Sequence, residues 1–370
     1  MRAVAVNPSV RSLSVIDIPE PKITAPTQVK LRMLEAGVCG TDREICACEY
    51  GLPPDGTPWL VIGHESLGEV IEVGSQVTRV RVGDLVVPMV RRPCPHDHCT
   101  ACRAGRPDFC YTGDFRERGI QGLPGFMTES VVDDEQYMNV VPRELRDIAV
   151  LVEPLTIAEK ALTQVAEVQR RLPWSCAPLH QRNWGHCHRA LVLGAGPVGL
   201  LGAMALAAAD FEVFVYSREM PPNAKAALVE SLGAHYLSSE QTAVDALPEV
   251  IGNIDVVFEA TGASSLSFDV MRVLGTNGVF VFTGVPGRKA PVAVDTDLIM
   301  RNLVLRNQVV FGTVNAGRES FEDAIRDLGI FQQRWPQAVR SLISGRFPMS
   351  AHRELLLDRP SGIKNVIELS

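Results

Sequence analysis

Long runs of one kind of side chain are missing from this sequence. It contains no block of five or six like charges, and its net charge of −7 is spread along the chain. Nucleic-acid binding is therefore not expected, because it requires a basic face. No window approaches the roughly 18 uninterrupted apolar residues of a membrane span, so no membrane partner is expected either. The chain begins with the short run MRAVAV and turns polar directly after it. This pattern is typical of a strand rather than of a secretory signal.

Length and cysteine content bear on the number of domains and on the cellular location. With 370 residues the chain is long for one core, since single cores stop growing at about 250–300 residues, and two domains are expected. The chain has nine cysteines and no secretory signal, which predicts a cytoplasmic location. In a reducing cytosol, cysteine clusters bind metal more often than they form disulfides.

The pattern of apolar residues changes along the chain. Residues 1–155 consist of short β-rich runs, such as 29–33, 68–73 and 84–90, broken by Gly and Pro. These runs predict an antiparallel, barrel-like domain. A helical pattern follows over 155–170, and residues 190–311 then alternate apolar strands with helices. Such alternation predicts a parallel sheet with helices on both faces.

The last segment is expected to return to the first domain. It contains a helical pattern around residues 321–328 and ends in a strand-like run at 363–369. We therefore assign residues 1–157 and 314–370 to one domain, with a cysteine-rich lobe at about 90–112, and residues 158–313 to the other.

A glycine-rich turn marks a dinucleotide site. It follows the strand-like run 190–193 and opens an Ala-rich helix, which is the context that such a fingerprint needs. Gly194 permits a tight turn, Gly196 lets the backbone approach a pyrophosphate, and Gly199 allows close helix–strand packing. The helix N-terminus offers N–H groups and a positive dipole end to the phosphates. The cofactor-binding residues of this turn are Gly194, Ala195, Gly196, Pro197, Val198 and Gly199.

The residues after the next strand bear on the choice of cofactor. An NAD-specific fold usually presents Asp or Glu there to the ribose 2′-hydroxyl. This chain has Ser217 and Arg218, which suit a 2′-phosphate, although Glu219 follows directly. NADP is therefore expected to be preferred, with NAD also accepted.

Two groups of metal-ligand residues precede this turn. Cys39, His64 and Glu65 form a mixed ligand set that suits catalytic zinc and leaves one coordination position open. Further along, four cysteines with a C-x4-C-x2-C-x7-C spacing predict a closed structural zinc site: Cys94, Cys99, Cys102 and Cys110. His96 or His98 is an alternative ligand in that lobe. Two zinc ions per chain are expected.

A third concentration of metal-ligand residues allows two interpretations. The polar stretch 172–189 is compatible with a further metal site or with an elongated surface loop. It carries Cys176, His180, His186, Cys187 and His188. Cys46 and Cys48 match no motif, and we interpret them as packing residues or free thiols.

Over essentially its full length, the chain resembles the zinc-containing medium-chain dehydrogenases, and within them the glucose 1-dehydrogenase group. The resemblance is carried by residues 39–42, 63–65, 90–94, 106–110, 125–127, 153–155, 194–199 and 312–315, and segments 112–114 and 313–315 narrow it to the glucose enzymes. It implies a GroES-like β-rich catalytic domain and a Rossmann domain with a doubly wound parallel sheet. A homo-oligomer, dimer or tetramer, is expected.

The resemblance also assigns roles to individual residues. Cys39, His64 and Glu65 are implied as zinc ligands, with Glu153 as an additional carboxylate at the metal. Thr41, Glu65 and Glu153 are expected to take part in catalysis, Thr41 as the first proton acceptor. The sugar contacts implied are Thr41, Asp114, Glu153 and Asn315. Further cofactor contacts are expected at Phe282, Thr283, Gly284, Thr313, Val314 and Asn315.

Two departures from the family pattern stand out. Four residues separate Cys94 from Cys99, where the family usually has two. The identity of the first ligand of the structural zinc is therefore left open. Val90 replaces an asparagine that contacts the sugar in some archaeal members. The activity implied is zinc-dependent oxidation of an aldose, D-glucose, at C1 to gluconolactone. A polyol or L-threonine 3-dehydrogenase on the same fold is an alternative, and a non-catalytic NADPH-binding sensor protein is a remote one.

Overall fold

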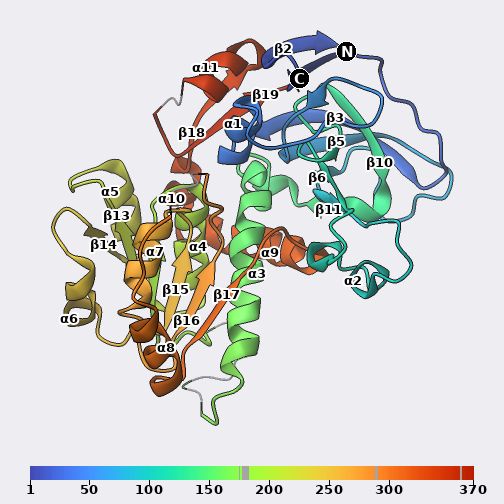
Figure 1. Ribbon diagram of the computed structural model, residues 1–370. Helices are drawn as coiled ribbons and strands as arrows, with labels where there is room; N and C mark the ends of the chain where they lie inside the picture. Colours follow the sequence, from blue (N-terminus) through green and yellow to red (C-terminus); the bar gives the residue numbers. More distant parts are fainter. Residues whose placement is uncertain (175, 177–182, 288–290, 359–360) are drawn as a thin grey trace. The chain divides into compact units, whose positions relative to one another are not determined.

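The computed structural model describes residues 1–174, 176, 183–287, 291–358 and 361–370. These residues form two units (Figure 1). Unit 1 comprises Met1–Thr156, Asn315–Gly329 and Val339–Ser370, and unit 2 comprises Ile157–Val314 and Ile330–Ala338. Among the described residues, no helix has the length and apolarity needed to cross a membrane.

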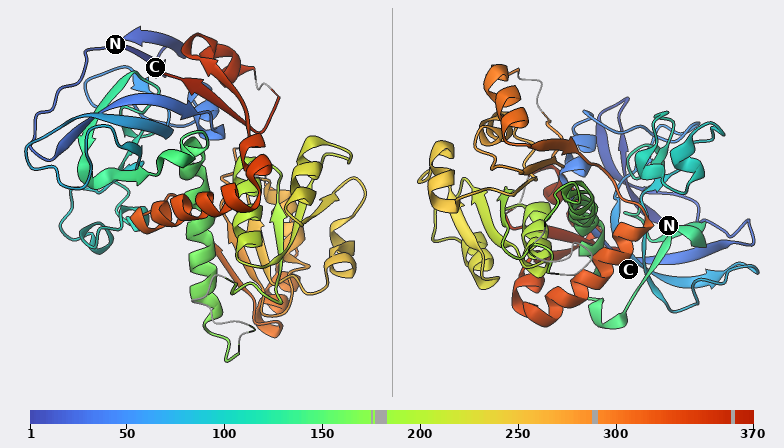
Figure 2. Two further views of the ribbon diagram at one scale, coloured as in Figure 1. Left: turned by 180° about the vertical axis from the view of Figure 1, so that it is seen from behind. Right: turned by 90° about the horizontal axis from the view of Figure 1, so that it is seen from below.

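Unit 1 is built on a seven-stranded, mostly antiparallel sheet (Figure 2). Its strands are β3 (Gln28–Gly37), β5 (Glu65–Val73), β6 (Leu85–Pro88), β10 (Ser130–Asp134), β11 (Met138–Val141), β18 (Ile343–Pro348) and β19 (Lys364–Glu368). Two three-stranded sheets accompany it: β1 (Arg2–Asn7), β2 (Ser12–Asp17) and β4 (Leu60–Val61); β7 (Arg91–Arg92), β8 (Arg116–Arg118) and β9 (Gly122–Leu123). The short helices of this unit are α1 (Gly40–Cys46), α2 (Thr100–Arg103) and α11 (His352–Leu357).

Strand β3 is the centre of this sheet. Val29, Leu31 and Met33 alternate along it and are fully buried, as the period of two along a strand requires. β5 pairs with β3 along nearly its whole length. β10 pairs with the first half of β3 and β19 with the second half. The C-terminal strand thereby lies beside the end of β3, two residues before Cys39.

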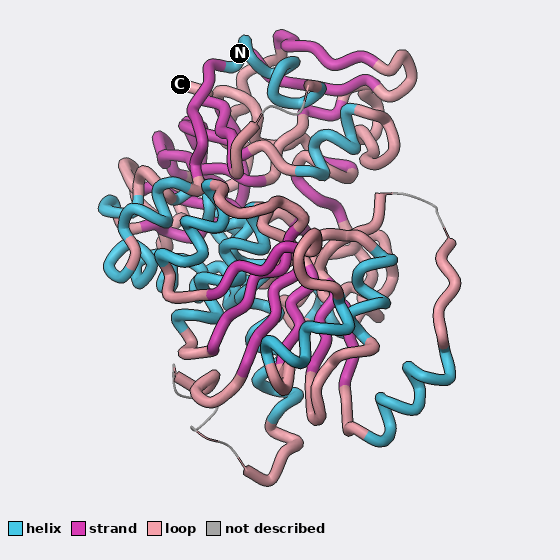
Figure 3. The backbone as a smooth tube through the Cα atoms, turned by 90° about the vertical axis from the view of Figure 1, so that its left-hand side faces the viewer, coloured by secondary structure: helices cyan, strands magenta, loops and turns pink. Residues whose placement is uncertain are grey.

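Unit 2 is a six-stranded parallel sheet in the order β14-β13-β12-β15-β16-β17. Its strands are β12 (Arg189–Leu193), β13 (Glu212–Ser217), β14 (His235–Ser238), β15 (Val256–Glu259), β16 (Val279–Phe282) and β17 (Val309–Gly312). In Figure 3 these strands form a layer between helices. The helices are α4 (Pro197–Ala208), α5 (Ala224–Ser231), α6 (Leu247–Ile251), α7 (Ser264–Met271) and α8 (Thr296–Leu305). The strand order reverses at β12, which is where ligands bind in such sheets.

Three helices lie at or near the division between the units in sequence. α3 (Val152–Gln169) and α9 (Arg318–Arg334) each contain residues of both units, and so does α10 (Pro336–Ser341). Residues 330–338 group with unit 2, whereas the sequence assigned all of 314–370 to the first domain. A helical pattern shows which face is apolar but not which neighbour that face contacts.

The fold class predicted from the sequence is confirmed. A β-rich unit with a largely antiparallel sheet and a unit with a parallel sheet and intervening helices are both present. β12 begins and ends within one residue of the predicted run 190–193, because this run is short and apolar and is followed by a glycine.

Candidate active site

The predicted catalytic metal ligands come together in unit 1. One ligand atom from each of Cys39, His64 and Glu65 lies within 4.8 Å of the other two. Cys39 precedes α1 as its N-cap residue, and its backbone N–H donates to Asp42 Oδ2 at 2.9 Å. The thiol is thus fixed at the start of α1.

His64 and Glu65 are placed by the entry into β5. Gly63 has a φ of 92°, and a Cβ there would meet Met127 Cγ at 2.5 Å, so only glycine makes this turn. Glu65 pairs with Gly37 across the sheet. A Cβ on Gly37 would meet Glu65 Oε2 at 2.2 Å, so the glycine leaves the space that the carboxylate occupies.

Buried charges surround this cluster. Asp42 is fully buried, and its Oδ1 lies 3.4 Å from His64 Nδ1. Burial alone lowers the pKa of His64, but the carboxylate of Asp42 and the thiol of Cys39 outweigh it and raise that pKa well above its ordinary value. A carboxylate behind a histidine is the usual arrangement for orienting a metal ligand.

Lys364 is a member of the site that the sequence analysis missed. It is 1% exposed, and its Nζ donates to Glu65 Oε1 at 2.7 Å, to Glu65 Oε2 at 2.5 Å and to Val38 O at 3.1 Å. Burial lowers the pKa of Lys364, but the charge of Glu65 outweighs this and raises it. Lysine in an apolar C-terminal strand is a signal of a buried ion pair, although the partner cannot be read from the sequence.

Glu153 lies close enough to respond to the same charges but is not among the three converging ligands. Burial and the neighbouring carboxylate of Glu65 raise the pKa of Glu153 to about 7, against the effect of His64. A carboxyl group with such a pKa exchanges protons near neutral pH.

The residues present suit a zinc ion. The set offers a thiol, an imidazole and a carboxylate, a combination that suits zinc. Asp42 Oδ1 and His64 Nδ1 are buried, lie 3.4 Å apart and make no hydrogen bond within the described residues. Glu65 differs from the expectation in one respect, since both of its oxygens already accept from Lys364.

The predicted sugar contacts lie in different surroundings. Thr41 is half-buried in the first turn of α1, next to Cys39. The carboxylate of Asp114 is exposed and pairs with His96. Asn315 has a φ of 57°, and its Nδ2 donates to Glu117 Oε1 at 2.9 Å.

Glu117 is a second residue that the sequence analysis missed. It is buried and also accepts from Arg91 Nε at 2.9 Å. The Arg91 guanidinium lies over the Phe115 ring, 3.7 Å from its centroid. This network holds the amide of Asn315 in one orientation, because both partners of Glu117 are donors.

The cysteine lobe has the predicted grouping. One sulfur from each of Cys94, Cys99, Cys102 and Cys110 lies within 4.8 Å of the others. His96 pairs with Asp114, and the His98 ring contacts Tyr111, so the four thiols form the cluster without them. Burial raises the pKa of Cys102 to about 12, whereas hydrogen bonds from Thr112 outweigh burial and lower that of Cys110 to about 6. Four sulfurs at this separation match a closed tetrahedral metal site.

The glycine turn of unit 2 has the geometry of a phosphate cradle. Gly194 has a φ of 100° and connects β12 to α4. A Cβ on Gly199 would meet Gly194 O at 2.0 Å, so this glycine is required for packing. A Cβ on Gly196 would meet nothing within 4 Å, which leaves open space at the helix N-terminus. Pro197 is the first residue of α4, where its missing N–H costs nothing.

The neighbouring loops of unit 2 are held by Glu259, which the sequence analysis also missed. This fully buried carboxylate at the end of β15 accepts from Thr261 N at 2.7 Å, Gly262 N at 2.8 Å and Gly284 N at 3.1 Å. The sequence feature that could have identified Glu259 is an acidic residue at the end of an apolar strand. Thr283 Oγ1 donates to the Glu259 carbonyl at 2.6 Å.

The predicted cofactor residues suit a dinucleotide. Ser217 ends β13, and the exposed Arg218 follows it. Glu219 pairs with Lys225, so its charge is already neutralised. Thr313 Oγ1 is buried and makes no hydrogen bond to any described residue, and the backbone of Val314 is fixed by Lys160 Nζ, which donates to its carbonyl at 3.0 Å.

A β-rich unit with a cluster of metal ligands and a parallel-sheet unit with a glycine turn are the two parts of a zinc-containing medium-chain dehydrogenase. Residues 25–143 match the model of the alcohol dehydrogenase GroES-like domain, and residues 146–369 match the model of the glucose dehydrogenase C-terminus. The chain belongs to the glucose 1-dehydrogenase family. Glucose 1-dehydrogenase of Methanocella arvoryzae is 38% identical over 370 residues, which cover 100% of this chain and 99% of that protein. That of Thermoproteus tenax is 38% identical over 371 residues, with 100% and 99% coverage.

Solved structures agree with this assignment. The glucose dehydrogenase of Haloferax mediterranei in complex with NADP, zinc and gluconolactone matches with a TM-score of 0.88 and 32% identity, covering 100% of this chain and 99% of that one. Galactitol-1-phosphate dehydrogenase of Escherichia coli matches with a TM-score of 0.78 at 18% identity over the whole of both chains. The second similarity concerns the fold alone.

Proposed function

We propose that this chain is a zinc-dependent enzyme that oxidises an aldose at C1, D-glucose to gluconolactone, with NADP as the preferred hydride acceptor and NAD as a second one. The observation that carries the proposal is the convergence of Cys39, His64 and Glu65 within 4.8 Å. The full-length similarity to glucose 1-dehydrogenases supports the choice of substrate.

Each group of the site has a chemical role in this proposal. When bound, zinc supplies a Lewis acid that acidifies the C1 hydroxyl, and NADP supplies the hydride acceptor. Thr41, two residues after Cys39, accepts the hydroxyl proton. Asp42 orients His64 through its Nδ1. Glu153, with its pKa of about 7, passes the proton on.

The substrate and cofactor contacts complete the proposal. Asp114 and Asn315 bind sugar hydroxyls, and such contacts discriminate strongly against substrates that lack them. Gly196 and the N-terminus of α4 bind the pyrophosphate, and Ser217 and Arg218 bind the 2′-phosphate. Phe282, Thr283, Gly284, Thr313, Val314 and Asn315 line the remaining cofactor site. Cys94, Cys99, Cys102 and Cys110 hold a second, structural zinc ion.

We also propose a homo-oligomer, a dimer or a tetramer, in the cytoplasm. β17 ends the parallel sheet, and α8 exposes Met300, Val304 and Leu305 by 64%, 74% and 64%. An unpaired strand edge beside exposed apolar side chains favours association of copies. Seven described cysteines are free thiols, which suits a reducing compartment, whereas Cys176 and Cys187 form a disulfide.

The test is a panel of aldoses and polyols with NADP and with NAD, followed by the absorbance of the reduced cofactor. An aldose should give the highest kcat/KM, and acid should be released as the lactone hydrolyses. Turnover of polyols alone, which yields ketoses and no acid, would contradict the aldose assignment.

A further inference from the structure

A third group of metal-ligand atoms lies on unit 2, at the residues that precede β12. Cys176 and Cys187 form a disulfide, with their Cα atoms 6.4 Å apart. One ring nitrogen of His188 lies within 4.8 Å of both sulfurs. The sequence analysis left a metal site and a surface loop open for this segment. His180 of the same stretch lies outside the described residues.

Cys187 and His188 belong to a turn that is fixed to the body of unit 2. The Trp184 ring packs edge-on against Phe211, with 4.7 Å between their centroids. Gly185 N donates to Ala209 O at 2.9 Å, and a Cβ on Gly185 would meet the Phe211 ring at 2.0 Å. Because only glycine fits there, the turn is built to lie close against Phe211.

The backbone on either side of the two ligands is equally constrained. His188 N donates to Gly185 O at 2.8 Å, and its carbonyl accepts from Glu212 N at 3.0 Å. Cys187 has a φ of 69°, a left-handed conformation that non-glycine residues seldom adopt. Such a conformation persists where the surroundings impose it, and it is commonest at functional sites.

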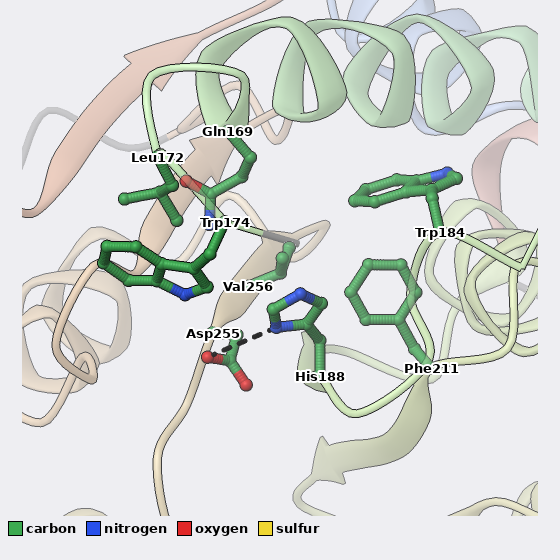
Figure 4. Close-up of a pocket in the computed structure, with 8 residues that line it drawn as sticks. All are labelled: Gln169, Leu172, Trp174, Trp184, His188, Phe211, Asp255 and Val256. Carbon is green, nitrogen blue, oxygen red and sulfur yellow. Dashed lines mark ion pairs between the residues drawn. The ribbon is translucent and has the colours of Figure 1, made fainter. Parts of the chain in front are cut away.

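The His188 ring faces the carboxylate of Asp255. Its Nδ1 lies 3.7 Å from Asp255 Oδ1, and Figure 4 shows the two side chains facing each other within a small pocket. Asp255 is itself fixed, since Oδ2 accepts from Arg189 N at 2.8 Å and Oδ1 from Asn253 Nδ2 at 2.7 Å. With Nδ1 on the side of the Asp255 carboxylate, Nε2 is the ring nitrogen of His188 that would bind a metal, and carboxylates commonly lie behind metal-bound histidines in this way.

We propose that this cluster is a redox-dependent zinc site, distinct from the two sites of unit 1. In the reduced chain, Cys176 Sγ, Cys187 Sγ and His188 Nε2 bind one zinc ion, and water completes the tetrahedron. Two thiolates and one imidazole form a ligand set that zinc accepts. In the oxidised chain the same sulfurs form the disulfide and are not available as thiolates.

The interconversion balances with a dithiol as the reductant. One thiolate of the dithiol attacks a sulfur of the Cys176–Cys187 disulfide, which breaks the S–S bond, releases one protein thiolate and leaves a mixed disulfide. The second thiolate of the dithiol then attacks the reductant's sulfur in the mixed disulfide and releases the other protein thiolate. The protein gains two thiols, and the reductant is oxidised to its own disulfide. Zinc then replaces the two thiol protons, which pass to solvent, and its own oxidation state does not change.

The experiment measures zinc per chain in the full-length protein by mass spectrometry of the metal, after dialysis against buffered zinc. One sample is purified without reductant and the other is treated with a dithiol. We expect one additional zinc ion per chain in the reduced sample. In Cys176→Ser and in His188→Ala the reduced and oxidised samples should bind nearly equal amounts.

His186→Ala is the matched control. His186 lies in the same turn, but its Nδ1 pairs with Asp210 Oδ2 at 3.1 Å and it does not belong to the cluster. This variant should keep the additional zinc. Alkylation of the thiols followed by peptide mass measurement establishes the redox state of each sample.

Two results would overturn the proposal: a reduced chain with both thiols free and no additional zinc, or an additional zinc that Cys176→Ser retains. The readout is a difference in metal content and needs no turnover. A failure of the proposed dehydrogenase activity would therefore leave this test intact.

Discussion

Lys364 and Glu65 form a buried ion pair between strands β19 and β5, whose members are 299 residues apart in the chain. Both residues are at most 1% exposed, and the ammonium group contacts both carboxylate oxygens. Glu65 is also one of the three converging ligands of the candidate zinc site. The pair therefore links metal binding to the stability of unit 1.

Replacing Lys364 should destabilise the metal-free protein more than the zinc-bound protein. Lys364→Met leaves the carboxylate of Glu65 buried without a counter-charge, and losing one partner of a buried pair costs about 3–5 kcal/mol. Bound zinc would offset part of that loss by supplying positive charge. Urea unfolding with and without zinc measures the difference, with Lys364→Arg as the control that keeps the charge. An equal loss in both states would show that Glu65 and the metal do not interact.

Removing the catalytic zinc should abolish turnover but leave cofactor binding nearly unchanged. Cys39→Ala removes a ligand in unit 1, whereas the glycine turn belongs to unit 2. Turnover of the aldose and titration of NADPH fluorescence measure the two effects separately. Cys48→Ser, at a half-buried thiol outside the metal-ligand groups of the described residues, is the control. Full activity in a verified zinc-free preparation would rule out the proposed chemistry.

Cys102→Ser should act on stability rather than on the chemical step. The four sulfurs of the lobe hold its loops together only when a metal binds them, so losing one ligand should lower the melting temperature and the zinc content. Thermal unfolding and metal analysis are the measurements. A variant that resists heat as well as the parent would contradict a structural zinc ion in this lobe.

Glu153 should make the stability of the metal-free protein fall as the pH rises. Its pKa is about 7 in the folded chain against an ordinary value of 4.5, so the folded state holds the proton over a range in which the unfolded chain has lost it. Stability present below about pH 4.5 is thus lost progressively up to about pH 7, by an amount on the order of 3 kcal/mol. The measurement is the free energy of unfolding across this range. Glu153→Gln should be more stable than the parent above pH 7 and should lack this part of the slope. Parallel pH profiles for the two proteins would disprove the assignment.

Arg218→Ala should weaken NADP selectively. Only NADP has the 2′-phosphate that this exposed guanidinium can contact, and a hydrogen bond to a charged group contributes about 1.5–3 kcal/mol. Affinity for NADP should fall by roughly ten- to a hundredfold, while NAD is little affected. The ratio of kcat/KM with the two cofactors is the measurement, and Arg272→Ala, at the residue directly after α7, is a control at another arginine of unit 2. If the ratio does not change, Arg218 does not contact the phosphate.

The sequence by itself determined the features that depend on neighbouring residues. The glycine turn from Gly194 to Gly199 was predictable because each glycine meets a local constraint between one strand and the next helix. The cysteine lobe was predictable because its four thiols are separated by short gaps and have few ways to meet. The alternation of strands and helices in unit 2 followed from apolar periodicity.

Only the tertiary structure decided which distant residues share a site. Strand pairing across the sheet brings Lys364 to Glu65, and the fold brings Glu117 to Asn315 over a separation of 198 residues. It also places Cys176 against Cys187 and His188, which the sequence left open between a metal site and a loop. Periodicity shows that a side chain is buried but not which partner it meets, because the partner is chosen by packing among strands far apart in sequence.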